Sequence, residues 1–219
     1  MNALAESRRS ALVDAGRPAL LVVDVQRDFA DPDTLAGWGV SAEGLAAVDA
    51  AVTTTAALVE DARRSGVAVV WIELAYDPAH PWRSSAWLQT GSPDAPTDGF
   101  PCVVGSPGAE WWRLSPAPGE ARIRKRFYSG FAGTELAATL DALGAGWVAI
   151  AGLTTECCIL ATAFDAAQHD LPAVVVGDAT AAYTAELHRS ALETLALNAA
   201  EVMPASALTE LWERSEVAR

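Results

Sequence analysis

The stretch "WVAIAGLTTECCILATAFDA", residues 147–166, decides the fold. Its first six residues form a short apolar run, which is typical of a parallel strand that is covered on both faces. Nearly continuous runs of the same kind occupy residues 18–25, 67–74 and 172–178. These four runs predict the central strands of a parallel sheet.

Segments with the Ala- and Leu-rich spacing of helices separate these strands. The first two helical segments are followed by Gly66 and Gly144, which act as helix stop signals. The predicted helices cover residues 43–65, 133–143, 155–169 and 185–199, with a last helix from about Ala205. Weaker strands at 121–125 and 201–204 bring the predicted sheet to six strands. The alternation of strands and helices predicts an α/β fold.

Length and composition set the broad class of the protein. A chain of 219 residues, 51% hydrophobic and 20% charged, is expected to form one globular domain over residues 1–219. Its net charge of −13 disfavours nucleic acid and anionic membranes as partners. Because we find neither an apolar run of about 18 residues nor a secretory segment, we expect a cytoplasmic protein. Its three cysteines, Cys102, Cys157 and Cys158, are then expected to be reduced thiols.

One long segment, residues 75–120, interrupts the alternation of strands and helices. It is rich in Pro, Gly, Ser and Asp, and it carries Trp82, Trp87, Trp111 and Trp112. A loop of this length is usually functional or disordered, and the tryptophans argue against disorder. Two interpretations stay open. The tryptophans form a pocket wall or an interface, or they pack onto their own loop.

Residues able to do chemistry follow three of the predicted strands, where ligands bind in open parallel sheets. Asp24 ends the first strand, Lys125 ends the strand at 121–125, and Cys158 follows the strand at 147–152. Each has a simpler interpretation. The aspartate would cap the next turn, the lysine would belong to a solvated basic edge, and the cysteine would be a small buried apolar residue.

Together, the three residues are consistent with a nucleophilic site. A helix N-terminus and a nearby cation lower the pKa of a thiol, and Lys125 would supply the cation for Cys158. Asp24 would take the thiol proton and later give it to a leaving amine. Free backbone N–H groups at the start of the helix would hold an oxyanion.

Three blocks, "LLVVDVQRDF", "KRFYSGFAGTEL" and "GLTTECCILATAFDA", resemble the isochorismatase-like cysteine hydrolase superfamily in their order and spacing. The resemblance spans about residues 17–205 and favours the branch of N-carbamoylsarcosine, biuret and ureidoacrylate amidohydrolases. It implies a three-layer αβα, Rossmann-like fold with a six-stranded parallel sheet in the order 3-2-1-4-5-6. In that order the first and fourth strands are neighbours, so that Asp24 and Cys158 would face each other.

The resemblance also distinguishes the two adjacent cysteines. The third block of the family places its nucleophile at Cys158 and leaves Cys157 at a variable position where it would pack. It further implies a cis peptide bond before Thr154 and an oxyanion hole made by the backbone N–H groups of Thr154 and Cys158. Asp24 and Lys125 would complete the catalytic triad.

The residues expected to contact the substrate are Gln26, Phe29, Trp82, Trp87 and Tyr128. Nicotinamidases in the superfamily carry an Asp-x-His and a further histidine after their second strand, which hold a metal. The corresponding segment here, "ELAYDPAHPWRSSAW", offers only Asp77 and His80. We therefore expect neither a metal nor another cofactor.

These observations predict a cysteine amidohydrolase that cleaves the C–N bond of a small amide, ureido or carbamoyl compound through an acyl-enzyme. The alternatives on the same scaffold are an isochorismatase-type hydrolase of a vinyl ether and a nicotinamidase-like hydrolase. A nucleotide-binding oxidoreductase is disfavoured because no glycine-rich phosphate-binding motif follows the first strand. A non-catalytic scaffold protein would be expected to lack a triad member. The resemblance also implies a homo-oligomer, either a dimer or a tetramer.

Overall fold

Six parallel strands form one sheet in the order β3-β2-β1-β4-β5-β6 in the computed structural model, which describes residues 3–97 and 99–217. The strands are β1 (Arg17–Val23), β2 (Ala68–Leu74), β3 (Ala121–Lys125), β4 (Ala145–Leu153), β5 (Ala173–Ala181) and β6 (Glu201–Met203). Each of them coincides with a predicted run to within about three residues. The predicted fold class and strand order are confirmed.

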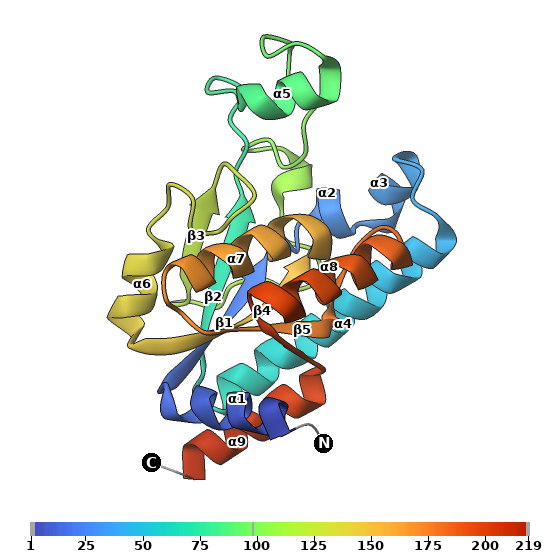
Figure 1. Cartoon of the computed structure of the whole chain (residues 1–219). Coiled ribbons are helices and arrows are strands. Elements are labelled where there is room, and N and C mark those ends of the chain that lie inside the picture. The colour runs from blue at the N-terminus through green and yellow to red at the C-terminus, as the bar shows by residue number, and fades with distance from the viewer. Residues whose placement is uncertain (1–2, 98, 218–219) are drawn as a thin grey trace.

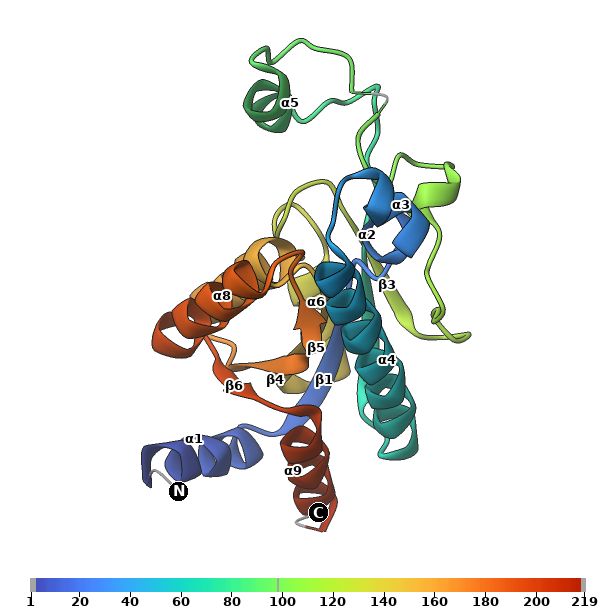
Figure 2. The same cartoon turned by 90° about the vertical axis from the view of Figure 1, so that its right-hand side faces the viewer.

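Helices cover both faces of the sheet, as Figure 2 shows for α4 and α8 on opposite sides. On one face, α1 (Ala3–Asp14), α4 (Ala42–Arg64) and α9 (Ala205–Val217) pack over a core that includes Leu20, Trp71 and Trp147. On the other face lie α6 (Leu136–Leu143), α7 (Leu160–Gln168) and α8 (Ala185–Asn198). The sheet is buried between two helical layers, which explains its apolar strands.

The helix α4 begins after Ser41, whose hydroxyl accepts a hydrogen bond from the backbone N–H of Gly44. By length and mean hydropathy, α4 reaches the range of a membrane span, although the sequence analysis found no such segment. Its buried residues, among them Val48 and Leu58, pack in the core, whereas Asp49 lies exposed. This amphipathic pattern is that of a core helix in a globular protein.

Several helices were not predicted from the sequence. The first of them, α1, precedes the sheet and contributes the buried Leu12 to the core. Two short helices, α2 (Arg27–Ala30) and α3 (Pro32–Gly37), follow β1 directly. They were missed because segments of four to six residues are too short to show a helical period.

The segment 75–120 is a loop with some structure of its own. It contains the helix α5 (Arg83–Thr90) and a single 3₁₀ turn at Pro107–Ala109. Figures 1 and 2 show α5 standing away from the sheet, at the opposite end of the molecule from α1 and α9. The loop returns to the body at Trp111, which pairs with Gln26 in an isolated β-bridge and packs edge-on against Trp71.

A glycine brings the ends of the two central strands together. The register pairs Val23 of β1 with Gly152 of β4. Gly152 has a φ of 117°, and a Cβ atom there would lie 2.0 Å from the carbonyl oxygen of Val23. Only glycine fits this approach. As a result, the residues that follow this pair, Asp24 and Leu153, start from neighbouring positions.

Candidate active site

Lys125 connects three parts of the protein at the carboxyl ends of the strands. Its amine lies 2.7 Å from Asp24 Oδ2, donates a hydrogen bond to Cys158 Sγ at 3.3 Å and donates another to the carbonyl oxygen of Phe127 at 3.0 Å. An ammonium group has three N–H donors, and here each of them has a partner. The structure therefore brings Asp24, Lys125 and Cys158 to one point.

The simpler interpretation of Lys125, a solvated basic edge, does not hold. Lys125 shares the buried face of β3 with Ile123, and its side chain is completely buried. The arginines at 122 and 124 point the other way and pair with the buried Glu73 at 2.9 and 2.8 Å. The alternation of a strand thus separates one buried lysine from its exposed basic neighbours.

Asp24 is buried directly after β1. Its backbone has a φ of 50°, in the left-handed region, and its N–H donates to the carbonyl oxygen of Ile72. A left-handed aspartate is uncommon, and residues in such conformations cluster at functional sites. The carboxylate is paired with Lys125, so Asp24 is not a cap for the next turn. The helix α2 that follows has Gln26 at its N-cap position.

Cys158 lies in a wide π-helical turn, Thr155–Ile159, between β4 and α7. The residue pattern predicts one α-helix over residues 155–169. In the structure the carbonyl oxygen of Thr154 accepts hydrogen bonds from the N–H groups of both Cys157 and Ile159, which widens the first turn. Turns of this kind are frequent at functional sites. The peptide bond between Leu153 and Thr154 is cis, as the resemblance implied.

The pKa values at this point differ from what the sequence suggested. The pKa of the Cys158 thiol is raised well above its usual value by a hydrogen bond with Cys157, by burial and by the charge of Asp24. The charge of Lys125 acts in the opposite direction but does not prevail. The resting thiol is therefore protonated, and a nearby base has to remove its proton.

Asp24 is a suitable base for that proton. Burial raises the pKa of the Asp24 carboxyl above its usual value of 3.8, while the charge of Lys125 acts to lower it. Burial alone would lower the pKa of Lys125, but the charge of Asp24 raises it, as does the charge of Cys158 once the thiol has lost its proton, so that the amine stays protonated. Lys125 thus carries a lasting positive charge between the Asp24 carboxyl, whose pKa is raised, and the Cys158 thiol. It can stabilise a negative charge on either group as the proton moves between them.

A cavity of about 190 Å³ opens above Cys158, and Lys125, Thr154 and Cys157 also line it. Its aromatic residues are Phe29, Trp38, Tyr76, Trp82, Phe100, Tyr128 and Tyr183. This active-site cavity is formed jointly by the sheet, the short helices after β1 and the α5 segment. Of the residues expected to contact the substrate, Phe29, Trp82 and Tyr128 line the active-site cavity.

The other two expected substrate contacts lie elsewhere. Trp87, on α5, is 58% exposed and does not line the active-site cavity. Gln26 is buried, and the hydrogen bonds of its side-chain amide join it to backbone groups. Its Nε2 donates to the carbonyl oxygens of Leu74 and Ala109 at 3.0 and 2.9 Å, and its Oε1 accepts from the N–H of Leu74. Gln26 thus ties the end of β2 to the 75–120 segment.

The tryptophans of the 75–120 segment divide between the two interpretations left open by the sequence. Trp82 stands in the wall of the active-site cavity, with its ring edge-on to Phe127 at 5.1 Å and to Tyr128 at 4.5 Å. Trp111 and Trp112 instead pack against the core under α4. The segment is therefore a pocket wall at one end and a packed loop at the other.

Asp28 anchors this wall, and the sequence analysis did not identify it. Its Oδ2 accepts a hydrogen bond of 2.7 Å from the backbone N–H of Cys102, which is buried in a left-handed conformation. A Cβ atom at Gly108 would lie 2.0 Å from the same carboxylate oxygen. Asp28 and Gly108 thus fix the loop that carries Phe100.

His188 is a second residue that was not identified from the sequence as part of the site. Its Nδ1 lies 2.8 Å from the hydroxyl of Thr155, the buried first residue of the π-helical turn. Burial lowers the pKa of His188 below 6.5, so that it is neutral near pH 7. Its position on α8 allows it to orient the turn that carries Cys158. Only the fold brings residues 155 and 188 together.

The residues considered for a metal site are paired with each other. His80 Nδ1 lies 2.7 Å from Asp77 Oδ2, and both side chains are exposed. Within residues 3–97 and 99–217, no group of three or more His, Cys, Asp or Glu side chains is arranged to hold a metal ion. Asp77 and His80 alone provide fewer ligands than a protein zinc site uses.

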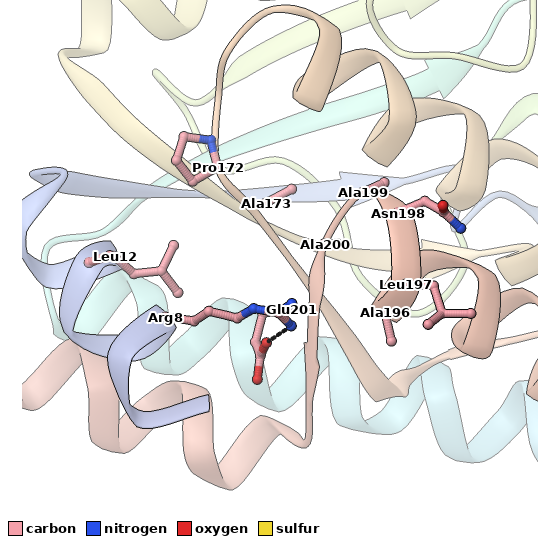
Figure 3. A pocket seen from close by; sticks show the side chains of 11 residues that line it. Arg8, Leu12, Pro172, Ala173, Ala196, Leu197, Asn198, Ala199, Ala200 and Glu201 are labelled. Carbon is pink, nitrogen blue, oxygen red and sulfur yellow. Dashed lines mark hydrogen bonds and ion pairs between the residues drawn. The ribbon is translucent and has the colours of Figure 1, made fainter. Parts of the chain in front are cut away.

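A second hollow, which we call the amino-end hollow, lies between α1, the start of β5 and the end of α8 (Figure 3). It measures about 370 Å³, and Leu12, Pro172 and Leu197 are among its lining residues. Arg8 and Glu201 form an ion pair of 3.2 Å across it. None of its described lining residues is a cysteine, histidine, lysine or aspartate. Its carboxylate, Glu201, is paired with Arg8, so that the described lining of this hollow offers no thiol, imidazole or unpaired carboxylate.

Comparison with known proteins agrees with this geometry. The model of the isochorismatase domain family matches residues 18–207. The ureidoacrylate amidohydrolase RutB of Methylobacterium radiotolerans is 31% identical over 84% of this chain and 74% of its own length. The maleamate amidohydrolase of Pseudomonas putida is 35% identical over 73% of this chain and 70% of its own length.

Among solved structures, the N-carbamoylsarcosine amidase of Thermoplasma acidophilum superposes with a TM-score of 0.68 and 27% identity. The match covers 86% of this chain and 96% of that protein. The strand order, the meeting of Asp24, Lys125 and Cys158 and a family match over nearly the whole sheet lead to the same conclusion. The chain belongs to the isochorismatase family of hydrolases.

Proposed function

We propose that this protein is a cysteine amidohydrolase that cleaves the C–N bond of a small amide, ureido or carbamoyl compound. The observation that carries the proposal is the position of Lys125 Nζ, 2.7 Å from Asp24 Oδ2 and 3.3 Å from Cys158 Sγ, at the floor of the active-site cavity. Relatives named for the hydrolysis of ureidoacrylate and maleamate support the C–N bond as the target.

In the first half of the reaction, Asp24 removes the Sγ proton of Cys158 and the thiolate attacks the substrate carbonyl. The carbonyl oxygen becomes an oxyanion, which the backbone N–H groups of Thr154 and Cys158 hold in place. Asp24 then gives its proton to the leaving nitrogen. The C–N bond breaks, the amine departs and a thioester to Cys158 remains.

In the second half, water attacks the thioester and Asp24 takes one of its protons. The tetrahedral intermediate collapses, the carboxylic acid departs and the proton returns to the sulfur. Lys125 remains charged throughout, since Asp24 and Cys158 raise the pKa of its amine. Its part is to hold negative charge on the carboxylate or the sulfur as the proton moves between them.

The proposal is tested by measuring ammonia release from a panel of small amides and ureides. We expect the wild-type protein to hydrolyse at least one of them and Cys158→Ser to lose all measurable turnover. Cys157→Ala is the matched control, because it removes the adjacent thiol and should keep activity within about tenfold. An active Cys158→Ser beside an inactive Cys157→Ala would reverse the assignment of the nucleophile.

Two results would move the protein to another activity of the same family. Turnover that survives loss of the Cys158 thiol would favour vinyl ether hydrolysis, for which the panel should include isochorismate. Turnover that is lost on dialysis against a strong chelator and restored by zinc or manganese would favour a nicotinamidase-like enzyme. We expect chelation to have no effect, because Asp24, Cys158 and the two N–H groups account for each step.

We also propose that the protein is cytoplasmic and forms a homo-oligomer, with one active-site cavity in each 219-residue chain. Sedimentation or light scattering of the purified protein tests the oligomer directly. Fractionation of the source cells tests the location.

A further inference from the structure

Seven of the described residues that line the active-site cavity are aromatic, so that rings form a large part of its wall. The ring centroids of Trp82 and Tyr128 lie 4.5 Å apart, and those of Tyr76 and Phe100 lie 5.1 Å apart. Phe29 contributes a further ring. Flat faces of this kind favour flat apolar groups, which stack on them or meet their edges.

No described cation is available to bind an anionic substrate in this cavity. Among the described residues that line it, only Lys125 carries a positive charge, and its three N–H donors are already used by Asp24, Cys158 and Phe127. The arginine in α5, Arg83, pairs with Asp94 at 2.8 Å and does not line the cavity. A carboxylate in the cavity would therefore lose its hydration without gaining an ionic partner.

The charge of the protein acts in the same direction. The chain carries a net charge of −13, whereas the charge of Asp24 beside the reacting atoms is balanced by Lys125. The net charge of the protein would repel an anionic substrate on approach. Uncharged compounds meet no such repulsion.

The size of the cavity limits the substrate further. A volume of about 190 Å³ is somewhat larger than the engineered protein cavity of about 150 Å³ that holds one benzene molecule. One ring with its carboxamide or ureido group fills such a space. A fused ring system or a long acyl chain would extend out of it.

We infer that the substrate carries an uncharged, flat, apolar group of about one ring next to the reacting carbonyl or ureido group. This inference rests on the proposed function and deepens it. It separates this protein from the relatives named for ureidoacrylate and maleamate, both of which are carboxylates.

The first experiment compares neutral and anionic substrates with the same reacting group. Benzamide is measured against succinamate, and phenylurea against 3-ureidopropionate, near pH 8. We expect kcat/KM to be at least about 100-fold higher for the neutral member of at least one pair. Equal or faster hydrolysis of the anionic members would overturn the inference while leaving the amidohydrolase function intact.

A substitution in the wall tests the reason for the preference. Gln89 lines the active-site cavity from α5, so Gln89→Arg would supply the missing cation. We expect this variant to lower the ratio of neutral to anionic kcat/KM by about tenfold or more. The control is Gln168→Arg, the same change on the exposed surface of α7, which should leave the ratio unchanged. A ratio unchanged in Gln89→Arg would contradict the inference.

Binding without turnover separates this inference from the proposed function. In Cys158→Ser the nucleophile is removed while the Asp24–Lys125 pair is kept, and calorimetric titration with benzamide and succinamate then reports binding alone. We expect benzamide to bind at least about tenfold more tightly than succinamate. If benzamide binds but the wild type hydrolyses no amide or ureide, the proposed function fails and the inference about the cavity stands. Tighter binding of succinamate, or no binding of benzamide, would overturn the inference.

Discussion

The active-site cavity and the amino-end hollow lie at opposite ends of the same parallel sheet. Only the smaller of the two, the active-site cavity, is lined by candidate catalytic residues. The amino-end hollow measures about 370 Å³ and the active-site cavity about 190 Å³. The two ends differ in the side chains that follow or precede the strands there. Because all strands are parallel, their carboxyl ends meet at one edge, where Asp24, Lys125 and Cys158 converge from β1, β3 and the turn after β4.

The two hollows also differ in how their polar groups are balanced. In the amino-end hollow, Arg8 and Glu201 form an exposed ion pair, and pairs of this kind contribute little to stability. In the active-site cavity, Lys125 and Asp24 are both completely buried, so that each depends on the other. A buried pair is costly to break, and its pKa values are sensitive to every neighbour. The substitutions below test this contrast.

The largest effect is expected from Asp24→Asn. The amide keeps the shape of the side chain but cannot accept the proton of Cys158, so that kcat should fall by about 10²–10⁴-fold or more. Steady-state kinetics on the substrate found in the screen measures the loss, and circular dichroism checks that the variant is folded. An Asp24→Asn enzyme with nearly normal kcat would show that another group is the base.

Lys125→Met is expected to affect both stability and pH dependence. It leaves the Asp24 carboxylate buried without a partner, which should lower the free energy of unfolding by about 3–5 kcal/mol in urea denaturation near neutral pH. The double variant Asp24→Asn/Lys125→Met should recover part of that loss, because no uncompensated charge remains. A single variant as stable as the wild type would contradict the burial of the pair.

The pH profile gives the sign of the Lys125 effect. The charge of Lys125 lowers the pKa of Asp24, which burial raises. In Lys125→Met that lowering is lost, so that the pKa of Asp24 rises further and its basic form is lost at higher pH. The acid limb of kcat/KM should therefore move to higher pH than in the wild type. An acid limb that stays in place or moves to lower pH would refute the charge role of Lys125.

A smaller effect is expected from Trp82→Ala, which opens the aromatic wall. Loss of an aromatic contact worth about 1–1.5 kcal/mol should raise KM by about 5- to 10-fold with little change in kcat. Trp87→Ala is the matched control, because Trp87 lies on the adjacent α5 but is 58% exposed and outside the cavity. Equal effects of the two substitutions would mean that the α5 segment acts as a whole rather than through its wall residue.

The smallest effect is expected in the amino-end hollow. Leu197 is 82% exposed at its rim, and Leu197→Ser should change the unfolding free energy by no more than about 0.5 kcal/mol. Its kcat/KM should equal that of the wild type. A clear loss of turnover in Leu197→Ser would show that the two ends of the sheet are coupled and that the contrast between them is wrong.

Much of the framework was predictable from the sequence because it depends on local pattern. The apolar runs of β1, β2, β4 and β5 are long enough to be recognised as buried strands, and the glycines after α4 and α6 mark where these helices end. The short helix α5 and the π-helical turn at Cys158 were not predicted. Neither has a periodic signal, since both depend on contacts with distant segments.

The chemical residues were predictable in kind, and the resemblance to a known family identified them individually. Position along the chain placed Asp24, Lys125 and Cys158 near strand ends, but only the resemblance chose Cys158 over Cys157. The alternation of β3 offered a further signal, since Lys125 shares the parity of Ile123 and therefore its buried face. The parts played by Asp28 and His188 had no local signal, because their partners lie more than thirty residues away.

By itself, the sequence determined the fold class, the strands and the family, and it predicted the nucleophile, because hydrophobic periodicity and contiguous motifs are written in neighbouring residues. Tertiary structure alone decided the state of the thiol, the members of the aromatic wall and the absence of an unpaired cation among its described residues. A pKa depends on burial and on charges within a few ångströms, and a cavity wall depends on which distant segments meet. These quantities are set when the chain closes around Cys158, because folding removes water from groups that are far apart along the chain.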